Sequence, residues 1–212
     1  MQAMPQPDKE QKELQAQDSS SRVTSLVKKA KAGNRAALGR LVELFQEDIF
    51  RMIYYRTRSR VDAEDLTQEV FVQVFKSLSR IREVERFRAW IFSIAVNRVR
   101  DFHRKKRIRA LLGVPSQGDE MEPGKGKTGH NPEAMENLMR QEFWKQIKHL
   151  LDKLSRGERE VFLLRFMDHL SIREISYALE KNESTIKTHL YRALGKLRKE
   201  PLILQMAEEE IP

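Results

Sequence analysis

Apolar residues recur every three or four positions through the first half of the chain, from Val23 to Arg109. This spacing puts them on one face of an α-helix, whereas a half-buried strand alternates polar and apolar residues. The segment has no alternating run and no glycine after Gly39, so it predicts an all-α domain of three helices around one core. The three apolar faces comprise Ala37, Leu41, Leu44, Phe45, Ile49, Met52 and Ile53; Leu66, Val70, Val74 and Leu78; and Phe87, Trp90, Ile91, Ile94 and Ala95.

A second pattern, nearer the C-terminus, predicts a helix-turn-helix. Its first helix has apolar residues at Ile172, Ile175 and Leu179, and its second at Ile186, Leu190, Ala193, Leu194 and Leu197. Asn182, in the turn between them, is a favourable N-cap. Hydrogen-bonding and cationic side chains lie opposite the apolar face of the second helix, as a helix in a DNA major groove requires. They are Ser184, Thr188, Tyr191 and Arg192, with Thr185 and Lys187 on the flanks.

The two patterns are separated by residues 111–137, which are rich in glycine and proline and predict a flexible linker. Residues 1–22 are rich in Gln, Ser and charge and predict a disordered tail, and residues 201–212 form a short acidic tail. The expected fold is therefore all-α, with two small helical domains at 23–110 and 138–200 joined by a flexible linker.

The charge of the chain narrows the choice of partner. Lys and Arg number 40 against 31 Asp and Glu, a net charge of +9, which favours a nucleic acid or an anionic membrane surface. No apolar run approaches the ~18 residues of a membrane-spanning helix, and the N-terminus lacks the apolar core of a signal peptide. We therefore expect a cytoplasmic protein without membrane insertion.

The composition also limits the chemistry. The chain has no cysteine, which excludes disulfides, thiol catalysis and cysteine-ligated zinc, and its five histidines are scattered. It has no glycine-rich phosphate loop and no nucleophile–base constellation. We expect no metal, no cofactor and no enzymatic activity.

The helix that begins near Asp62 has an acidic N-terminal half, Asp62-Ala-Glu-Asp-Leu-Thr-Gln-Glu. Carboxylates in the first turns stabilise a helix through its dipole, and capping alone can explain them. The alternative is that Asp65, Gln68 and Glu69 dock on a basic surface of a partner. The sequence leaves both interpretations open.

The next helix is basic, because Asp101 is the only acid within residues 86–109. A merely solvated helix usually mixes its charges, so this one favours contact with phosphates. Aromatic residues lie among the cations and are candidates for stacking on unpaired bases. Helical spacing favours core packing for Phe87 and Trp90, whereas Phe92 lies off the apolar face and is the stronger stacking candidate.

These motifs resemble two regions of one known family. Asp62-Ala-Glu-Asp-Leu-Thr-Gln-Glu-Val-Phe, followed by Phe87-Arg-Ala-Trp-Ile-Phe-Ser-Ile-Ala-Val-Asn-Arg and a basic run, resembles region 2 of bacterial sigma factors. Leu154-Ser-Arg-Gly-Glu-Arg-Glu-Val-Phe-Leu-Leu-Arg and the helix-turn-helix resemble region 4. Both occur in the family's order with no third structured region between them, as in the extracytoplasmic-function group. The resemblance covers roughly residues 23–108 and 138–199.

The resemblance implies a sigma factor that binds core RNA polymerase and directs promoter-specific initiation by reading −35 duplex DNA and melted −10 DNA. Core polymerase is the implied partner, through the clamp helices of its largest subunit and its flap region, and an anti-sigma factor is a further candidate. The residues that correspond to the clamp-binding motif are Asp65, Leu66, Gln68, Glu69 and Phe71.

In the family, the loop corresponding to residues 79–85 captures a base flipped from the −10 element, and the next helix opens the duplex and holds the non-template strand. The residues implied here for −10 binding and melting are Arg80, Arg82, Phe87, Arg88, Trp90, Asn97, Arg98, Arg100, Arg104, Lys105 and Arg107. The helix-turn-helix would read the −35 element through Ser184, Thr185, Lys187, Thr188, Tyr191 and Arg192.

The turn of the helix-turn-helix departs from the family pattern. Members commonly have glycine there followed by an apolar residue, whereas this chain has Glu180 and Lys181. A non-glycine residue with positive φ costs about 1 kcal/mol, so a different turn geometry is one expectation. Ser176 also stands where a small alanine usually packs between the helices.

Two other protein classes compete with this interpretation. Glu158-Arg-Glu-Val-Phe and Thr185-Ile-Lys-Thr-His-Leu also resemble the DNA-binding domain of LuxR-type transcriptional regulators. Such regulators usually carry a receiver of alternating strands and helices, which the N-terminal half does not predict. A basic amphipathic membrane-surface protein would explain the charge but not the acidic helix or the exposed face of the second helix.

Overall fold

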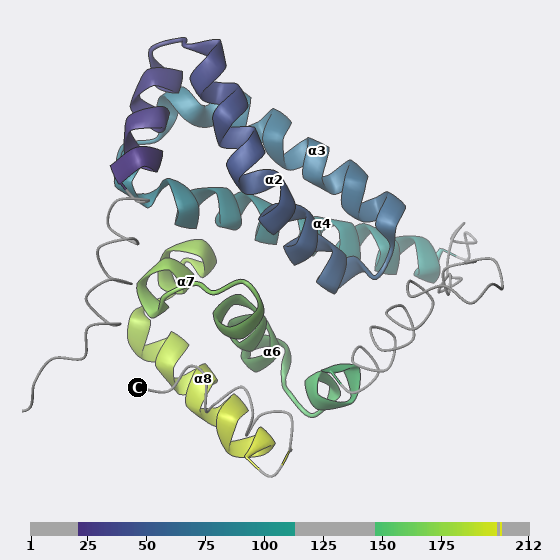
Figure 1. Ribbon diagram of the computed structural model, residues 1–212. Helices are drawn as coiled ribbons and strands as arrows, with labels where there is room; N and C mark the ends of the chain where they lie inside the picture. The colour runs from purple at the N-terminus through teal and green to yellow at the C-terminus, as the bar shows by residue number, and fades with distance from the viewer. Residues whose placement is uncertain (1–20, 113–146, 199, 201–212) are drawn as a thin grey trace, which may run out of the picture. The chain divides into compact units, whose positions relative to one another are not determined.

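The computed structural model describes residues 21–112, 147–198 and 200. The chain forms two compact units, the first built from residues 21–112 and the second from most of the described residues after 146 (Figure 1). The described residues are helical or lie in turns, and no strand occurs among them. The all-α prediction is therefore confirmed.

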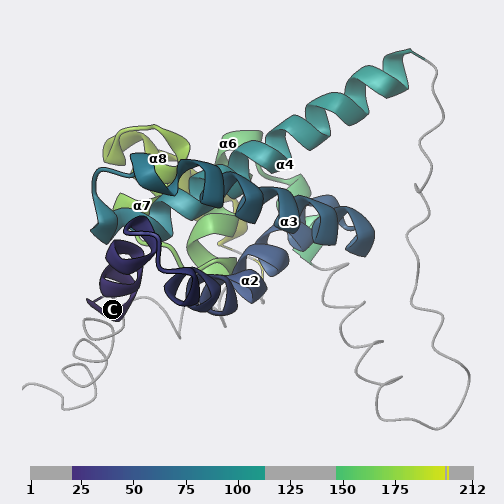
Figure 2. The same ribbon diagram turned by 90° about the horizontal axis from the view of Figure 1, so that it is seen from above.

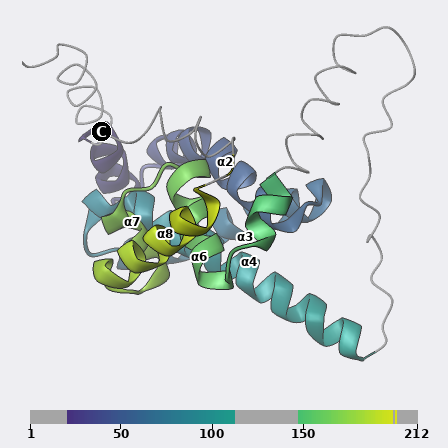
Figure 3. The same cartoon turned by 90° about the horizontal axis from the view of Figure 1, so that it is seen from below.

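Unit 1 consists of a helix ending at residue 31, three long helices and two short 3₁₀ turns. The long helices are α2 (Arg35–Thr57), α3 (Arg60–Ser77) and α4 (Phe87–Leu111), and each packs against the other two. The 3₁₀ turns η1 (Leu78–Arg80) and η2 (Val84–Arg86) connect α3 to α4. The C-terminal end of α4 extends beyond the other helices of the unit (Figure 2, Figure 3), and its residues from 107 onward are exposed.

Local sequence explains where the first two long helices begin and end. The Asn34 side chain accepts a hydrogen bond of 2.9 Å from the Ala37 N–H and caps α2. That helix ends at Arg58, which has φ 59° and donates its N–H to the Tyr54 carbonyl at 2.9 Å. Ser59 caps α3 in the same way as Asn34 caps α2. The reversal between α2 and α3 therefore takes only two residues.

The predicted apolar faces of α2 and α3 form the core of unit 1, with one exception. Leu44 was expected in the core but its side chain is 53% exposed. On α4 the buried face is wider than predicted and rotated, because this helix packs against both α2 and α3. Its buried residues are Phe87, Ala89, Ile91, Phe92, Ala95, Val96 and Val99, while Trp90 and Ile94 are half-buried.

The described part of unit 2 begins with helical residues 147–152 and continues through three further helices. These are α6 (Arg156–Phe162), which runs into the π-helical turn η3 (Leu163–Met167), then α7 (Ile172–Leu179) and α8 (Glu183–Leu197). A core cluster joins the first helix, α6 and η3 to one face of α8. Its buried members are Ile147, Leu150, Leu151, Leu154, Phe162, Leu163, Ala193 and Leu197. Helices α7 and α8 form the predicted helix-turn-helix.

The predicted tails and linker lie almost entirely outside the described residues. Two boundaries differ slightly where they can be compared: residues 21 and 22, assigned to the N-terminal tail, are helical, and α4 continues one residue into the predicted linker. None of the described helices combines the length and apolar character needed to span a membrane.

Candidate nucleic-acid interface

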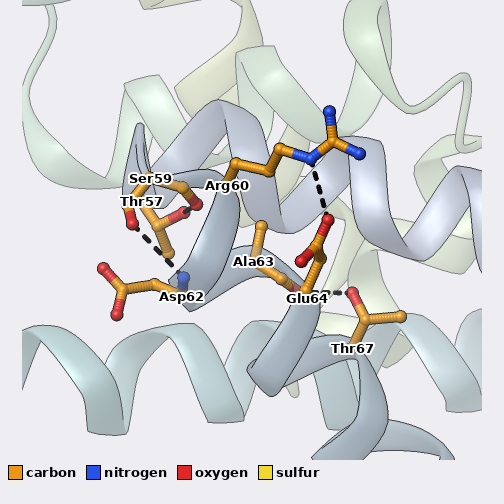
Figure 4. Close-up of polar contacts among 7 residues, drawn as sticks. All are labelled: Thr57, Ser59, Arg60, Asp62, Ala63, Glu64 and Thr67. Carbon is orange, nitrogen blue, oxygen red and sulfur yellow. Dashed lines mark hydrogen bonds and ion pairs between the residues drawn. The ribbon is translucent and has the colours of Figure 1, made fainter. Parts of the chain in front are cut away.

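The N-terminus of α3 is stabilised by its own polar residues (Figure 4). The Ser59 hydroxyl accepts a hydrogen bond from the Asp62 N–H at 3.2 Å, and Arg60 forms an ion pair of 2.8 Å with Glu64. The hydrogen bond and the pair of opposite charges raise the pKa of the Arg60 guanidinium. Thr67 donates its hydroxyl to the Ala63 carbonyl at 2.6 Å. Ser59 therefore caps the helix through the Asp62 N–H, and the Glu64 carboxylate is occupied by a residue of the same helix.

The outward face of α3 carries the remaining acidic motif. Asp65, Gln68 and Glu69 are exposed, as a docking surface requires. Leu66 and Phe71, which the family motif also placed at the polymerase, are only 7% exposed and pack in the core. That part of the expectation is corrected: these two side chains support α3 from beneath because their positions face α2 and α4, and only the three polar residues are exposed.

A polar link joins the acidic helix to the basic one. The Arg98 guanidinium of α4 lies 3.7 Å from a carboxylate oxygen of Glu69 and donates a hydrogen bond of 3.2 Å to the Gln73 side chain. Glu69 and Arg98 come from the two different predicted surfaces, one for polymerase and one for DNA. This role of Gln73 was not predictable from the sequence, because its partner is 25 residues away.

The loop between α3 and α4 is held by apolar residues three positions apart. Leu78, Ile81, Val84 and Phe87 are all buried, with the last only 1% exposed. This spacing matches the three residues per turn of a 3₁₀ helix and places the intervening side chains outward. Arg80 and Arg82 are accordingly exposed. Phe87, expected among the −10 contacts, is a core residue instead, because it packs edge-on against Phe45 at 5.4 Å.

The −10 residues predicted on α4 fall into two groups. Asn97, Arg104, Lys105 and Arg107 are exposed, and Arg88, Trp90, Arg98 and Arg100 are half-buried. Within these groups, Arg104 forms an ion pair of 3.0 Å with Asp101, and the Arg88 guanidinium lies 5.4 Å from the centre of the Phe92 ring.

The aromatic residues of α4 mainly build the core. Phe92 was the stronger candidate for base stacking, but it is 1% exposed, so this expectation is wrong. It is buried because the core face of α4 is wider than one apolar stripe. Trp90 packs 5.8 Å from Phe87, ring centre to ring centre, and is half-buried.

The outward face of α8 matches the residues expected to read duplex DNA. Ser184, Lys187, Thr188, Tyr191 and Arg192 are exposed and Thr185 is half-buried, while Ile186, Ala193 and Leu197 face the core.

Some hydroxyls on that face already have partners within the helix. Thr188 donates its hydroxyl to the Ser184 carbonyl at 2.8 Å, and Ser184 donates to the Asn182 side chain at 3.0 Å. Asn182 caps α8 by accepting the Thr185 N–H at 2.8 Å, as predicted. The exposed cations Lys187 and Arg192 are therefore the strongest candidates for donors to bases.

The turn before α8 adopts the conformation that usually requires glycine. Glu180 has φ 53°, in the left-handed region. Two hydrogen bonds close the turn: the Lys181 N–H donates to the Ser176 carbonyl at 3.0 Å, and the Ser176 hydroxyl donates to the Lys181 carbonyl at 2.5 Å. The serine that replaces the usual alanine therefore contributes to a turn without glycine.

Glu158 fixes the position of α8 from within unit 2. Its carboxylate accepts hydrogen bonds from the Lys196 ammonium at 2.6 Å and from the Ser155 N–H at 2.8 Å. These interactions, led by Lys196, lower the pKa of the nearly buried Glu158 to about 2. The Ser155-x-x-Glu158 capping box is readable from the sequence, but its partner Lys196, 38 residues away, is not.

A metal-ion site needs several ligand side chains close together. Among the residues that the structure describes, no three His, Asp or Glu side chains come close enough together to hold a metal ion.

Comparison with known proteins identifies the family. The family model of Sigma-70 region 2 matches residues 41–108, and that of Sigma-70 region 4 matches residues 144–197. The first match spans most of α2, all of α3, the loop and most of α4, and the second contains the helix-turn-helix. A region 2 domain in the N-terminal half decides against the LuxR-type alternative.

Curated relatives share both regions. The ECF RNA polymerase sigma factor BldN of Streptomyces coelicolor is 31% identical over 183 residues, which cover 86% of this chain and 67% of BldN. SigD of Mycobacterium tuberculosis is 30% identical over 84% of each chain. SigW of Bacillus subtilis is 26% identical and is covered over 94% of its length.

Solved structures agree on the fold. CnrH, in its complex with the cytosolic domain of CnrY, has a TM-score of 0.61 at 24% identity, covering 87% of this chain and 97% of CnrH. RpoE of Bartonella quintana has a TM-score of 0.55 at 18% identity. The chain belongs to the extracytoplasmic-function sigma factors, the subunits that direct RNA polymerase to promoters.

Proposed function

We propose that the two units divide the work of promoter recognition. Unit 1 docks on the clamp helices of core RNA polymerase through Asp65, Gln68 and Glu69, and holds the melted −10 strand along the loop and α4. Unit 2 places α8 in the major groove of the −35 element. The observation that supports this division is the separation of charge within unit 1, where exposed carboxylates lie on α3 and exposed cations on α4.

The residues assigned to DNA follow from their exposure. Arg80 and Arg82 on the loop, and Asn97, Lys105 and Arg107 on α4, are available to phosphates or unpaired bases. Arg88, Trp90, Arg98, Arg100 and Arg104 line the same helix and complete the strand-binding surface. On α8, the contacts are Ser184, Thr185, Lys187, Thr188, Tyr191 and Arg192.

Run-off transcription tests this function directly. Purified chain and core enzyme are incubated with a library of genomic promoter fragments, and the 5′ ends of the transcripts are mapped. We expect start sites absent from reactions with core enzyme alone, with shared −10 and −35 sequences upstream. If the chain adds no start site to those of core enzyme, the proposal is wrong.

The chain itself would perform no chemistry. Phosphodiester bond formation belongs to the polymerase, and the sigma factor contributes binding energy for docking and for strand separation. We place it in the cytoplasm, where the chromosome is transcribed.

We also propose an anti-sigma factor as a partner. The solved CnrH structure contains the cytosolic domain of CnrY, and that of RpoE contains the anti-sigma factor NepR. Affinity purification of the chain from its native host should recover such a protein, and addition of that protein should abolish the run-off transcripts. Recovery of polymerase subunits alone would argue against this partner.

A further inference from the structure

A single hydrogen bond ties the loop between α3 and α4 to the N-terminal helix. The Lys31 ammonium donates to the main-chain carbonyl of Ile81 at 2.6 Å, across 50 residues of sequence. Lys31 is the last residue of the helix that ends at residue 31, and it lies outside the segment that matches Sigma-70 region 2.

The backbone on the lysine side of this bond is fixed. The Ala32 N–H donates to the Lys28 carbonyl at 3.2 Å, and the Asn34 N–H donates to the Lys29 carbonyl at 3.1 Å. Gly33, at φ 89°, supplies the left-handed turn between these bonds. Asn34 then caps α2. Lys31 is therefore presented to the loop from a well-defined helix end.

The Ile81 carbonyl, on the loop side of this bond, lies where the backbone leaves the 3₁₀ turn η1. Ile81 ends η1, where its N–H donates to the Leu78 carbonyl at 3.2 Å, and its side chain is anchored in the core. The backbone adopts an extended conformation at this residue, with ψ 124°. Holding the Ile81 carbonyl fixes the peptide plane shared with Arg82, and so the direction in which the exposed Arg82 side chain leaves the loop.

The far end of the loop has its own restraints. The Arg86 N–H donates to the Glu83 carbonyl at 3.0 Å, and the Arg86 side chain pairs with the Glu83 carboxylate at 2.7 Å. Val84 anchors this end in the core as Ile81 anchors the other. Between the two anchors, the Lys31 ammonium holds the main-chain carbonyl of Ile81.

We propose that Lys31 is a positioning residue that sets the loop of residues 79–85 for capture of a −10 base. This inference rests on the proposed function of unit 1, in which the loop helps to hold the melted −10 strand. Lys31 acts through the Ile81 carbonyl and touches no DNA. Its bond is charge-assisted and part-buried, but Lys31 itself is exposed and outside the core, so loss of the bond loosens the loop without unfolding the unit.

Three variants of the full chain test this role. Lys31→Met removes the ammonium group and keeps the aliphatic stem, and Lys31→Arg keeps a cationic donor. Lys28→Met removes a matched exposed charge from the same helix. Each variant is first measured free in solution, by hydrogen exchange of residues 81–86. Each is then bound to core enzyme together with a promoter fragment that run-off transcription has identified. An abasic site is scanned through the −10 non-template strand to find the captured base.

We expect Lys31→Met to speed amide exchange in the loop by about 2- to 10-fold, the range of one hydrogen bond. It should reduce discrimination between the intact strand and the strand abasic at the captured position by a similar factor. Association with core enzyme, −35 binding and the salt dependence of DNA binding should not change. Lys31→Arg should keep most of the wild-type loop protection and strand discrimination, and Lys28→Met should resemble the wild type.

Two results would overturn the proposal. Unchanged loop exchange and unchanged discrimination would show that the bond does not order the loop. An equal loss of affinity for intact and abasic strands, with a shallower salt dependence, would show that Lys31 contacts a phosphate directly. Because loop exchange is measured on the free chain, a failure of the proposed promoter function is separable from a failure of the lysine's role.

Discussion

Glu158 links the start of α6 to the end of α8 through one nearly buried carboxylate. The hydrogen bond from Lys196, and after it the Ser155 N–H, hold the pKa of Glu158 at about 2 in the folded chain. The unfolded value is about 4.3. The folded pKa is thus the lower one, so the carboxylate contributes stability above pH ~4.3 and loses this contribution as the pH falls toward ~2.

The first prediction follows from that linkage. Glu158→Gln should lower the free energy of unfolding at neutral pH, by about 1–3 kcal/mol, because a charged hydrogen-bond acceptor is lost. It should also flatten the dependence of unfolding on pH between about 5 and 3. Urea unfolding at several pH values, followed by exchange of α8 amides, measures both. The control is Glu180→Gln, an exposed glutamate of the same unit; equal pH profiles for the two variants would contradict the prediction.

The second prediction concerns the backbone of Glu180. Its φ of 53° costs a residue with a Cβ about 1–2 kcal/mol, and its exposed side chain offers little packing in return. Glu180→Gly should raise the free energy of unfolding by about 0.5–1 kcal/mol after the larger chain entropy of glycine is subtracted. Glu180→Ala, which keeps the Cβ, should give no such gain. If both variants are stabilised equally, the effect comes from removing the Glu180 charge and not from the backbone conformation.

Several features at the residue scale were predictable from short-range sequence patterns. Asn182 as an N-cap and the unusual residue Glu180 in the turn could both be read from their neighbours, and the structure bears out each. The pairs Lys196–Glu158 and Lys31–Ile81 could not, because each joins positions that only tertiary folding brings together.

At the scale of whole helices, a single apolar stripe identifies most buried residues but underestimates the width of the buried face. Each of the three long helices packs against the other two. Beside the predicted stripes, α3 also buries Ala63 and Phe71, and α4 also buries Phe92 and Val96. A helix with two partners needs a wider apolar arc than a stripe analysis assigns.

The same limit explains the errors in the candidate site. Leu66, Phe71 and Phe87 were placed at partner surfaces by motif, although each also fits a core position at helical spacing. Burial decides between the two roles, and it depends on which helices meet. The polar residues Asp65, Gln68 and Glu69 had no alternative in the core, and their exposure was predictable.

The third prediction belongs to α8 as a recognition helix. Lys187 lies in the N-terminal half of the helix, where a recognition helix contacts base edges, whereas Arg198 lies beyond its C-terminal end. Lys187→Ala should weaken −35 binding by about 1–3 kcal/mol and relax the preference at one base pair. Arg198→Ala should weaken binding to all sequences equally or not at all. Selection of bound promoter variants by each protein measures the preference, and an unchanged preference in Lys187→Ala would move the readout elsewhere on the helix.

For the molecule as a whole, the distribution of charge distinguishes a surface suited to a protein partner from one suited to a nucleic acid. A chain with net charge +9 has a general attraction for DNA, which gives no reason for exposed carboxylates on α3. Glu64 pairs with Arg60 and Glu69 lies 3.7 Å from Arg98, whereas helix capping at Ser59 gives no role to the exposed Asp65. The proposed docking on the polymerase would give this acidic face a role that the attraction for DNA does not.

The fourth prediction tests that docking in the complete complex. The double variant Asp65→Asn/Glu69→Gln should weaken association with core enzyme on the order of 10-fold, ~1.4 kcal/mol, because two charge-assisted contacts are lost. The loop, α4 and α8 keep their DNA contacts, so run-off transcription should fall at low concentrations of the variant and recover at saturating ones. The matched control is Glu43→Gln/Glu47→Gln, which removes two exposed acids from α2. Equal affinity of both variants for core enzyme would mean that the acidic face of α3 serves the helix alone, whereas a transcription defect that persists at saturation would place Asp65 or Glu69 in strand opening.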